Sequence, residues 1–234
     1  APNSCYSVLT GLRFFYKHVT EKEIPVTYSI RRTPRKLPEV LSMQNIWKII
    51  CSAKNLKHKM ILMTTYSAGL RASETRHLKA ENIDSKAMLI KVRGKGDKDR
   101  YTLLSKRLLV ELKTYYRKYR PGSYLFPSSF SKKNNQPLSY EAIRLIYEKA
   151  RKKAGVKRGT GIHTMRHSFA THLLEAGYDI RKIQVLMGHA RLTTTMIYMH
   201  VSRQTLSKIP SPLDLIDNKH ARKEDRNDDP NHKS

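Results

Sequence analysis

The stretch that decides the fold runs from residue 163 to residue 200 and reads HTMRHSFATHLLEAGYDIRKIQVLMGHARLTTTMIYMH. Its first part carries apolar residues at helical spacing, namely Met165, Phe169, Leu173 and Ala176. We expect a helix here that buries this stripe and turns His163 and Arg166, which share another face, away from the core.

Two more short helices are expected in the same stretch. Asp179 can cap the first of them, and Gly188 can end it in a left-handed conformation. The next helix, capped by Thr193 or Thr194, is predicted to carry Tyr198. The stretch therefore brings cationic side chains, hydrogen-bond donors and a phenol onto consecutive short helices, an arrangement that suits the binding of a phosphate.

The charge of the whole chain indicates a nucleic-acid partner. Its 234 residues include 46 Lys and Arg against 19 Asp and Glu, which gives a formal net charge of +27 at pH 7. A surplus of this size is typical of proteins that bind nucleic acid. A ribosome-like structural protein and a merely cationic domain remain as alternatives on charge alone.

Cysteine usage and hydropathy exclude other classes of protein. Cys5 and Cys51 lie far apart and lack the spacing of a metal site, so we expect a reducing compartment and no structural metal. No apolar run in the sequence is long enough to cross a bilayer, and the first residues lack a signal pattern. We therefore expect a soluble, cytoplasmic protein without a membrane partner.

Composition divides the chain into three parts: residues 1–37, 38–217 and 218–234. The first part holds one amphipathic helix and a basic, proline-containing linker, and is interpreted as the last piece of something larger. The basic residues of this linker are predicted to contact a DNA backbone, although a solvated loop explains them equally well: Arg31, Arg32, Arg35 and Lys36. The third part is polar and mixed in charge, which predicts a disordered tail.

The main domain, residues 38–217, is predicted to be mainly α-helical with a small antiparallel β-hairpin, an α+β fold. Arg71 stands at the start of a short helix, where unpaired backbone N–H groups favour an anion, and Glu74 can hold its side chain. Two β-rich runs around residues 87–92 and 100–104 predict the hairpin, with Lys95 at its tip.

A basic helix is expected from Ser139 to about Gly155, because apolar residues recur there with the helical period. Its cations, represented by Arg144 and Lys152, are predicted to contact DNA, and a water-facing helix is the alternative.

Five short motifs occur together in this chain: AGLRASE around Arg71, GKGDKDR around Lys95, HTMRHSFATHLLEAG with His163 and Arg166, LMGHA at His189, and TTTMIYMHV at Tyr198. Each of them is weak alone. In this order and combination the chain closely resembles the tyrosine recombinase (phage integrase) family. The resemblance covers residues 38–217 and implies that family's catalytic-domain fold, with residues 1–37 as the remnant of an N-terminal core-binding domain.

The resemblance also implies an activity, the cleavage and rejoining of DNA through a covalent 3′-phosphotyrosyl intermediate. Arg71 and Arg166 would hold the phosphate, as planar guanidinium groups can, and Tyr198 would be the nucleophile. Lys95 would act as general acid. One ester replaces another, so neither ATP nor a metal cofactor is expected.

The resemblance leaves two roles open for two of the histidines. His163 and His189 would donate to the phosphate or assist proton transfer at the tyrosine, with His163 as the better base candidate. We assign structural roles to the remaining histidines of the motif regions, which are His77, His167, His172 and His200.

The resemblance implies double-stranded DNA as the partner and a homo-tetramer on paired sites, as in recombinases of bacterial mobile elements, with the enzyme on the nucleoid while bound. A DNA-binding module that is inactive alone, a type IB topoisomerase and, less favoured, an RNA scaffold are the alternatives. The segment after Tyr198 could pack on a neighbouring protomer or on its own domain.

Overall fold

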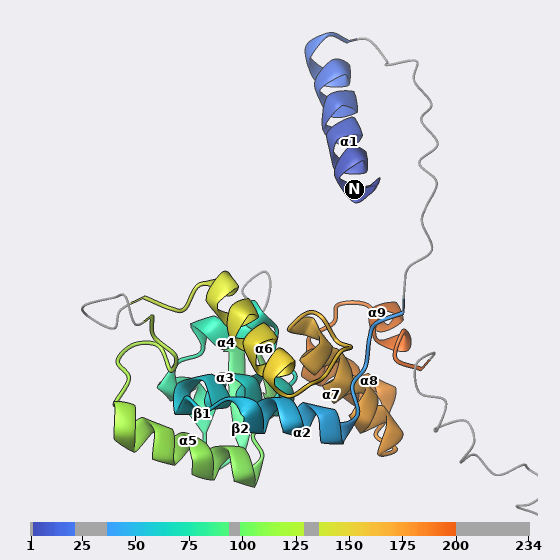
Figure 1. Ribbon diagram of the computed structural model, residues 1–234. Coiled ribbons are helices and arrows are strands. Elements are labelled where there is room, and N and C mark those ends of the chain that lie inside the picture. Colours follow the sequence, from blue (N-terminus) through green and yellow to red (C-terminus); the bar gives the residue numbers. More distant parts are fainter. Residues whose placement is uncertain (1, 22–36, 94–98, 129–135, 200–234) are drawn as a thin grey trace, which may run out of the picture. The chain divides into compact units, whose positions relative to one another are not determined.

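The computed structural model describes residues 2–21, 37–93, 99–128 and 136–199 (Figure 1). The chain forms two compact units, Ala1–Leu37 and Pro38–Ser234. The first unit contains helix α1 (Pro2–Val19), whose large apolar side chains, among them Leu12, Phe14 and Phe15, are exposed. Part of the linker, the hairpin tip with Lys95, and the predicted tail at 218–234 lie outside the described residues.

The second unit is mainly helical. Its α-helices are α2 (Met43–Ser52), α3 (Leu56–Ser67), α4 (Ala72–His77), α5 (Lys106–Tyr119), α6 (Tyr140–Lys153), α7 (His163–Glu175), α8 (Ile180–Met187) and α9 (Leu192–Met196). A short 3-10 helix, η1 (Ala80–Asn82), follows α4. Polar side chains cap several helix starts by accepting a backbone N–H: Ser42, Asn55, Ser105, Ser139 and Asp179.

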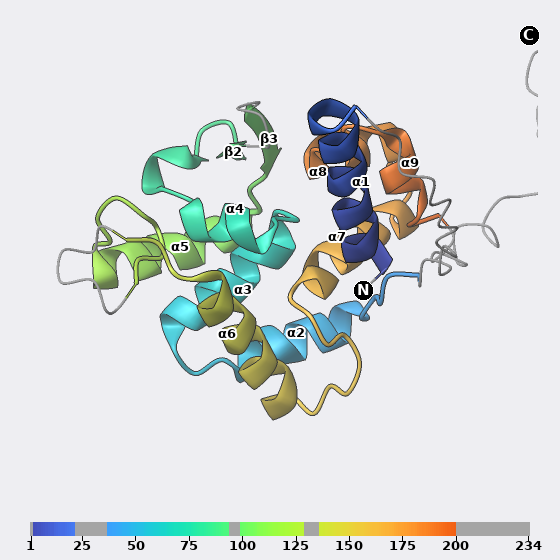
Figure 2. The same ribbon diagram turned by 90° about the horizontal axis from the view of Figure 1, so that it is seen from above.

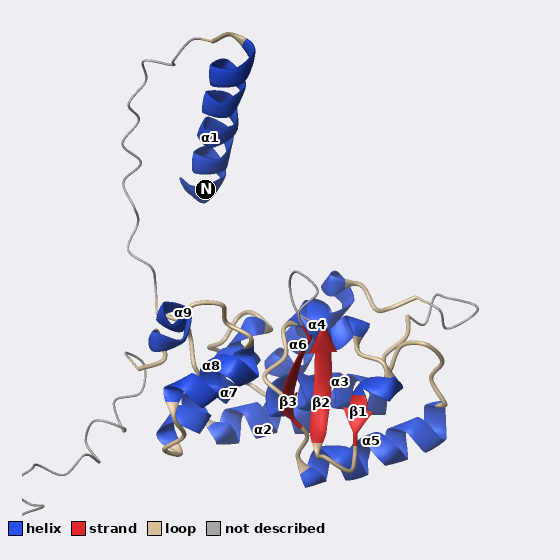
Figure 3. Ribbon diagram, turned by 180° about the vertical axis from the view of Figure 1, so that it is seen from behind, coloured by secondary structure: helices blue, strands red, loops and turns tan. Residues whose placement is uncertain are grey.

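A three-stranded antiparallel sheet accompanies the helices (Figure 3). Strand β2 (Leu89–Arg93) pairs with β1 (Ile83–Asp84) on one side and with β3 (Asp99–Leu103) on the other. The predicted hairpin is thus present, and β1 is an addition that the sequence pattern did not indicate because it is only two residues long. The expected mainly α fold with a small antiparallel sheet is confirmed.

Helix α3 lies at the centre of the unit and packs against α2, α5, α6 and α7. Its residues Met60, Ile61 and Leu62 are fully buried, and so it has apolar residues on more than one face. Helices α2 and α6 lie side by side over one flank (Figures 1 and 2). A second, smaller apolar cluster joins α7, α8 and the turn after α9, and consists of Phe169, Ala170, Leu174, Ile183, Met187 and Tyr198.

The expectation that Arg166 turns away from the core is wrong. Helix α7 is buried on most of its circumference, and the side chain of Arg166 is only 4% exposed. Its guanidinium can be buried because backbone carbonyls of Gly69 and Met187 accept its hydrogen bonds.

The expectation that Tyr198 lies on the third short helix is also wrong. Helix α9 starts after Arg191 instead of Thr193 or Thr194, and it ends at Met196. Tyr198 follows in a turn in which its backbone N–H donates to the carbonyl of Thr195 at 3.1 Å. The backbone N–H of Met199 likewise donates to the carbonyl of Met196 at 3.0 Å. These two hydrogen bonds each span three residues instead of the four of an α-helix, so the chain continues as a turn.

Candidate active site

Arg71 stands immediately before α4, at its N-cap position. Its backbone N–H donates to Oε2 of Glu74 at 2.7 Å, and its guanidinium donates to Oε1 of the same carboxylate at 2.8 Å. Glu74 therefore satisfies an otherwise unpaired N–H at the helix start and also fixes the arginine side chain. That side chain remains 36% exposed and is open to a ligand.

Arg100 is a second partner of Glu74, and sequence analysis assigned it no role. It belongs to β3 and donates to both carboxylate oxygens, at 2.8 and 2.9 Å, in the two-pronged geometry typical of arginine. Its Nε also donates to the carbonyl of Leu186 at 3.1 Å. The only sequence signal for this residue is its position at the end of the GKGDKDR motif.

Gly188 allows the close approach of Arg100. It has a φ of +60°, and a Cβ at this position would lie 2.6 Å from Cδ of Arg100. The glycine thus ends α8 in the left-handed conformation and at the same time leaves room for the arginine.

Arg166 joins the same carboxylate from α7. One nitrogen of its guanidinium donates to the carbonyl of Gly69 at 2.6 Å and lies 3.6 Å from Oε2 of Glu74. The other donates to the carbonyl of Met187. Burial lowers the pKa of Arg166 to about 10, and the positive charge of Arg71 adds to the effect, so the group keeps its charge at neutral pH.

We call Arg71, Glu74, Arg100 and Arg166 the arginine–glutamate cluster. Three guanidinium groups and one carboxylate leave two net positive charges in a largely buried place. Burial acts to raise the pKa of Glu74, but hydrogen bonds and charges, chiefly from Arg100, outweigh it and lower the pKa. The carboxylate is therefore ionised, and the surplus charge of the cluster favours an anion.

Tyr198 lies beside this cluster and is 2% exposed. Burial raises the pKa of its phenol, whereas the positive charges of Arg166 and Arg71 act to lower it. Its hydroxyl is 3.0 Å from Nδ1 of His167. Sequence analysis gave His167 a structural role, because the position next to Arg166 carries no pattern that would indicate contact with a residue 31 positions later.

His189 links Tyr198 to the cluster. Since a guanidinium can only donate, Nε2 of His189 accepts from Arg166 at 3.2 Å, and Nδ1–H donates to Oγ1 of Thr195 at 2.9 Å. Its ring stacks on that of Tyr198, with centroids 6.4 Å apart and planes at 15°. Burial lowers the pKa of His189 to about 4, with Arg166 and Arg71 contributing, and so the imidazole is neutral at pH 7.

His163 begins α7, one helical turn before Arg166. Its side chain keeps part of its surface exposed. Partial burial, followed by the charges of Arg166 and Arg71, lowers its pKa, which indicates that it lies near the cluster in its neutral form.

The structure brings together six of the predicted site residues: Arg71, Glu74, His163, Arg166, His189 and Tyr198. Lys95 and the linker residues Arg31, Arg32, Arg35 and Lys36 lie outside the described residues. On α6, Lys152 is exposed, whereas Arg144 forms ion pairs with Glu141 and Glu148 of its own helix. These ion pairs account for part of the basic surplus that the sequence shows there.

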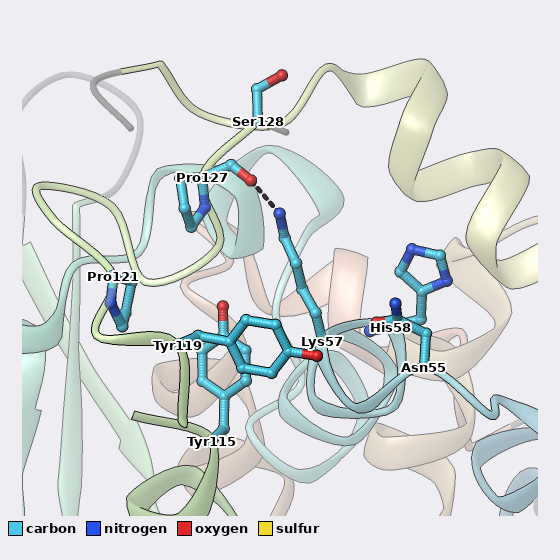
Figure 4. Close-up of a pocket in the computed structure, with 8 residues that line it drawn as sticks. All are labelled: Asn55, Lys57, His58, Tyr115, Tyr119, Pro121, Pro127 and Ser128. Atoms are coloured by element: carbon cyan, nitrogen blue, oxygen red, sulfur yellow. Dashed lines mark hydrogen bonds between the residues drawn. The ribbon is translucent and has the colours of Figure 1, made fainter. Parts of the chain in front are cut away.

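A separate pocket of about 200 Å³ lies around the start of α3 and the end of α5 (Figure 4). It is lined by Asn55, Lys57, His58, Tyr115, Tyr119, Pro121, Pro127 and Ser128. Lys57 donates to the carbonyl of Pro127 across it. None of the predicted site residues lines this pocket.

The part of the chain that the structure describes shows no group of three or more His, Cys, Asp or Glu arranged to hold a metal ion. Within the same described ranges, no helix is both long enough and apolar enough to span a membrane.

Comparison with known proteins gives consistent matches over most of the chain. The family model described as the phage integrase family matches residues 39–205. A putative integrase/recombinase of Sinorhizobium fredii, y4qK, is 38% identical over 219 residues, which cover 92% of this chain and 70% of that protein. Tyrosine recombinase XerA of Pyrococcus horikoshii is 40% identical over 188 residues, 80% of this chain and 65% of that protein.

A solved structure extends the similarity to the fold. The XerH site-specific recombinase, in a pre-cleavage complex with its difH substrate, matches with a TM-score of 0.65 and 26% identity. The match covers 86% of this chain and 61% of the XerH chain.

Proposed function

This chain belongs to the phage integrase family, and from that premise we propose that it is a site-specific DNA recombinase that cleaves through Tyr198. The observation that supports the proposal most directly is that Tyr198 lies beside the arginine–glutamate cluster. The cluster has two net positive charges. Two of its arginines, Arg166 and Arg71, act to lower the pKa of the Tyr198 phenol. An anion binder and a nucleophile therefore share one place.

The charge of the cluster fits phosphoryl transfer. A phosphodiester carries one negative charge, and attack by an oxygen nucleophile adds a second on the non-bridging oxygens in the transition state. Two net positive charges in a buried site match the transition state better than the ground state, which is the condition for catalysis. Arg71 and Arg166 are the arginines that we assign to the phosphate, and Arg100 holds Glu74 in place.

In the proposed step, the phenolic oxygen of Tyr198 forms a bond to phosphorus and the bond to the 5′-oxygen breaks. We assign the protonation of that leaving oxygen to Lys95, by analogy with the family. His163 remains the candidate for donating to the phosphate, and we assign His189, whose two nitrogens are engaged by Arg166 and Thr195, to the support of Arg166. The reverse attack by a 5′-hydroxyl rejoins a strand, and the phosphotyrosyl ester conserves the energy of the original bond, so the cycle needs no ATP.

DNA is the proposed partner, in keeping with the XerH site-specific recombinase, whose solved structure is bound to its difH substrate. We propose that the linker cations Arg31, Arg32, Arg35 and Lys36, together with Lys152 of α6, contact its phosphates. Four protomers would assemble on two paired sites. Since the substrate is cellular DNA, we assign the enzyme to the cytoplasm and, while bound, to the nucleoid.

The test is a covalent adduct. A duplex selected from a random-sequence library by binding to the chain is nicked near the protected segment, so that cleavage releases a short fragment and cannot reverse. We expect the chain to form a DNA adduct that resists SDS, and Tyr198→Phe to form none. Tyr178→Phe is the matched control, because Tyr178 is exposed on the loop before α8 and its loss should leave the adduct intact.

Other outcomes would redirect the assignment. An adduct that persists in Tyr198→Phe would remove Tyr198 as the nucleophile. Binding without an adduct in the unaltered chain would support an inactive DNA-binding module, and relaxation of supercoiled DNA without a defined site would support a topoisomerase. Sedimentation of the chain on a duplex with two sites tests the tetramer, which a mass below four protomers would contradict.

A further inference from the structure

His167 is a half-buried residue of α7 whose side chain contacts the hydroxyl of Tyr198. The distance from Nδ1 to the phenolic oxygen is 3.0 Å, and the two rings are tilted by 48° with centroids 5.8 Å apart. Its neighbour Arg166 points about 100° further around the helix, toward the carbonyls of Gly69 and Met187. One helical turn thus supports the cluster and also reaches the phenol.

His189 is the other ring that touches Tyr198, but both of its nitrogens are already engaged. Nε2 accepts from Arg166 and Nδ1–H donates to Thr195. It lies against the face of the tyrosine ring by stacking, so neither nitrogen is directed at the hydroxyl. His167 is the histidine for which a hydrogen bond to the hydroxyl exists in the described structure.

We propose that His167 is a catalytic residue that accepts the proton of Tyr198 during the attack on phosphorus. The inference rests on the proposed function and assigns to His167 the proton acceptance for which sequence analysis favoured His163. The O–H bond of Tyr198 breaks as its oxygen bonds to phosphorus, and the proton moves to Nδ1 of His167. The bond from phosphorus to the 5′-oxygen breaks, and that oxygen takes a proton from the general acid. In rejoining, the imidazolium returns its proton to the departing phenol.

The charged and titratable groups around His167 keep its ring in the neutral form before the reaction. His163 and Arg166 lie near it on α7, and His189 and Tyr198 face it from the segments after α8 and α9. Burial lowers the pKa of His167 to about 4, and His163 and Arg166 add to the effect. The ring is therefore neutral at pH 7 and has a lone pair to accept a proton. Tyr198, whose pKa burial raises, needs such an acceptor.

A second histidine–tyrosine pair on the same helix provides a matched control. Nδ1 of His172 lies 2.9 Å from the hydroxyl of Tyr66, and His172 is 7% exposed. The pair has the same atoms and nearly the same distance as His167 and Tyr198, but it joins α7 to α3 and includes no member of the arginine–glutamate cluster.

The experiment measures single-turnover formation of the adduct by the unaltered chain, His167→Asn, His167→Ala and His172→Asn. Asparagine can hold the tyrosine by a hydrogen bond near the position of Nδ1, but it cannot take up a proton. We expect His167→Asn and His167→Ala to slow cleavage by about 100-fold or more, with DNA affinity and thermal midpoint close to those of the unaltered chain for the asparagine variant. His172→Asn should cleave at the unaltered rate per folded molecule.

A second substrate separates the two proton transfers. Sulfur in place of the bridging 5′-oxygen gives a leaving group that needs no acid, so it should restore cleavage to Lys95→Ala but not to either His167 variant. Cleavage by His167→Asn within about threefold of the unaltered chain, or its restoration by sulfur, would overturn the proposal. These outcomes differ from failure of the proposed function, in which the unaltered chain itself forms no adduct.

Discussion

The arginine–glutamate cluster and the segment that carries Tyr198 are neighbours that are held in different ways. The cluster draws its residues from α4, β3 and α7, and each guanidinium has a carboxylate oxygen or a backbone carbonyl as a fixed acceptor. Tyr198 lies beyond a helix of five residues. Its side chain is held by one hydrogen bond to His167, by stacking on His189 and by apolar packing.

This difference separates two requirements of the proposed chemistry. Donors that stabilise charge in a transition state are effective when they are fixed before the reaction. A nucleophile can instead be carried on a short segment that is held by fewer polar contacts, because such segments open at low free-energy cost. The following predictions test whether the cluster is the rigid part and the tyrosine segment the adjustable part.

Loss of the Glu74 carboxylate should have the largest effect. The side chain of Glu74 is only 6% exposed. Glu74→Ala therefore leaves three guanidinium groups without their shared anion at a buried position. Breaking buried pairs of this kind typically costs about 3–5 kcal/mol of the free energy of unfolding. Urea unfolding at pH 7 measures the loss, and adduct formation should fall with it because Arg71 loses its anchor. Glu141→Ala, which removes an exposed partner of Arg144, should have little effect on either quantity.

Low pH should remove the contribution of the Glu74 carboxylate to the free energy of unfolding. The pKa of Glu74 is lowered in the folded protein from the ordinary value of 4.5, so the carboxylate stabilises the fold above that value and loses this effect as the pH falls through its folded pKa. The difference in unfolding free energy between the unaltered chain and Glu74→Gln should be full at pH 7 and shrink below about pH 4.5. A difference that stays constant from pH 7 to pH 3 would show that the carboxylate is not held as described.

A smaller effect is expected from Gly69→Ala. Gly69 has a φ of +61°, and a Cβ there would lie 2.3 Å from a ring carbon of Phe169. Overpacking of this kind costs about 1–3 kcal/mol of unfolding free energy, and displacement of the Gly69 carbonyl should slow cleavage by moving Arg166. Gly155→Ala is the control, since Gly155 has a similar φ of +70° and nothing within 4 Å. If both variants lose the same stability, backbone strain alone explains the effect.

The sequence predicted those parts of the site that depend on local rules. Arg71 at a helix start and Glu74 one turn later follow from capping and from i, i+3 geometry, and the two residues make these contacts. The helix ends at Asp179 and Gly188 follow from the same kind of rule. Helix and hairpin periodicity gave the fold class, and the combined motifs gave the family.

Local sequence rules could not predict the contacts between segments that are far apart in the chain. Arg100 and Glu74 are 26 positions apart, and Arg166 and Gly69 are 97 apart. No periodicity shows that a strand arginine reaches a helix carboxylate or that a guanidinium can be buried on backbone carbonyls. Arg166 was therefore expected to face outward. For the same reason, His167 was given a structural role although its ring contacts the proposed nucleophile.

The smallest effect is expected at Thr195, which supports His189 from within the tyrosine segment. Thr195→Val removes the acceptor of the His189 Nδ1–H, whose hydrogen bond is 2.9 Å long, at a fully buried position. The Nδ1–H of His189 then has no acceptor, because the donor of Arg166 keeps the proton off Nε2, and we expect the ring to be held less firmly against Tyr198. One hydrogen bond is worth about 0.5–1.5 kcal/mol, so cleavage should slow by about three- to tenfold. Thr194→Val, at an exposed neighbouring position, should cleave normally. Equal rates for both variants in single-turnover adduct formation would mean that stacking alone orients His189, and that the tyrosine segment depends even less on polar contacts than the cluster does.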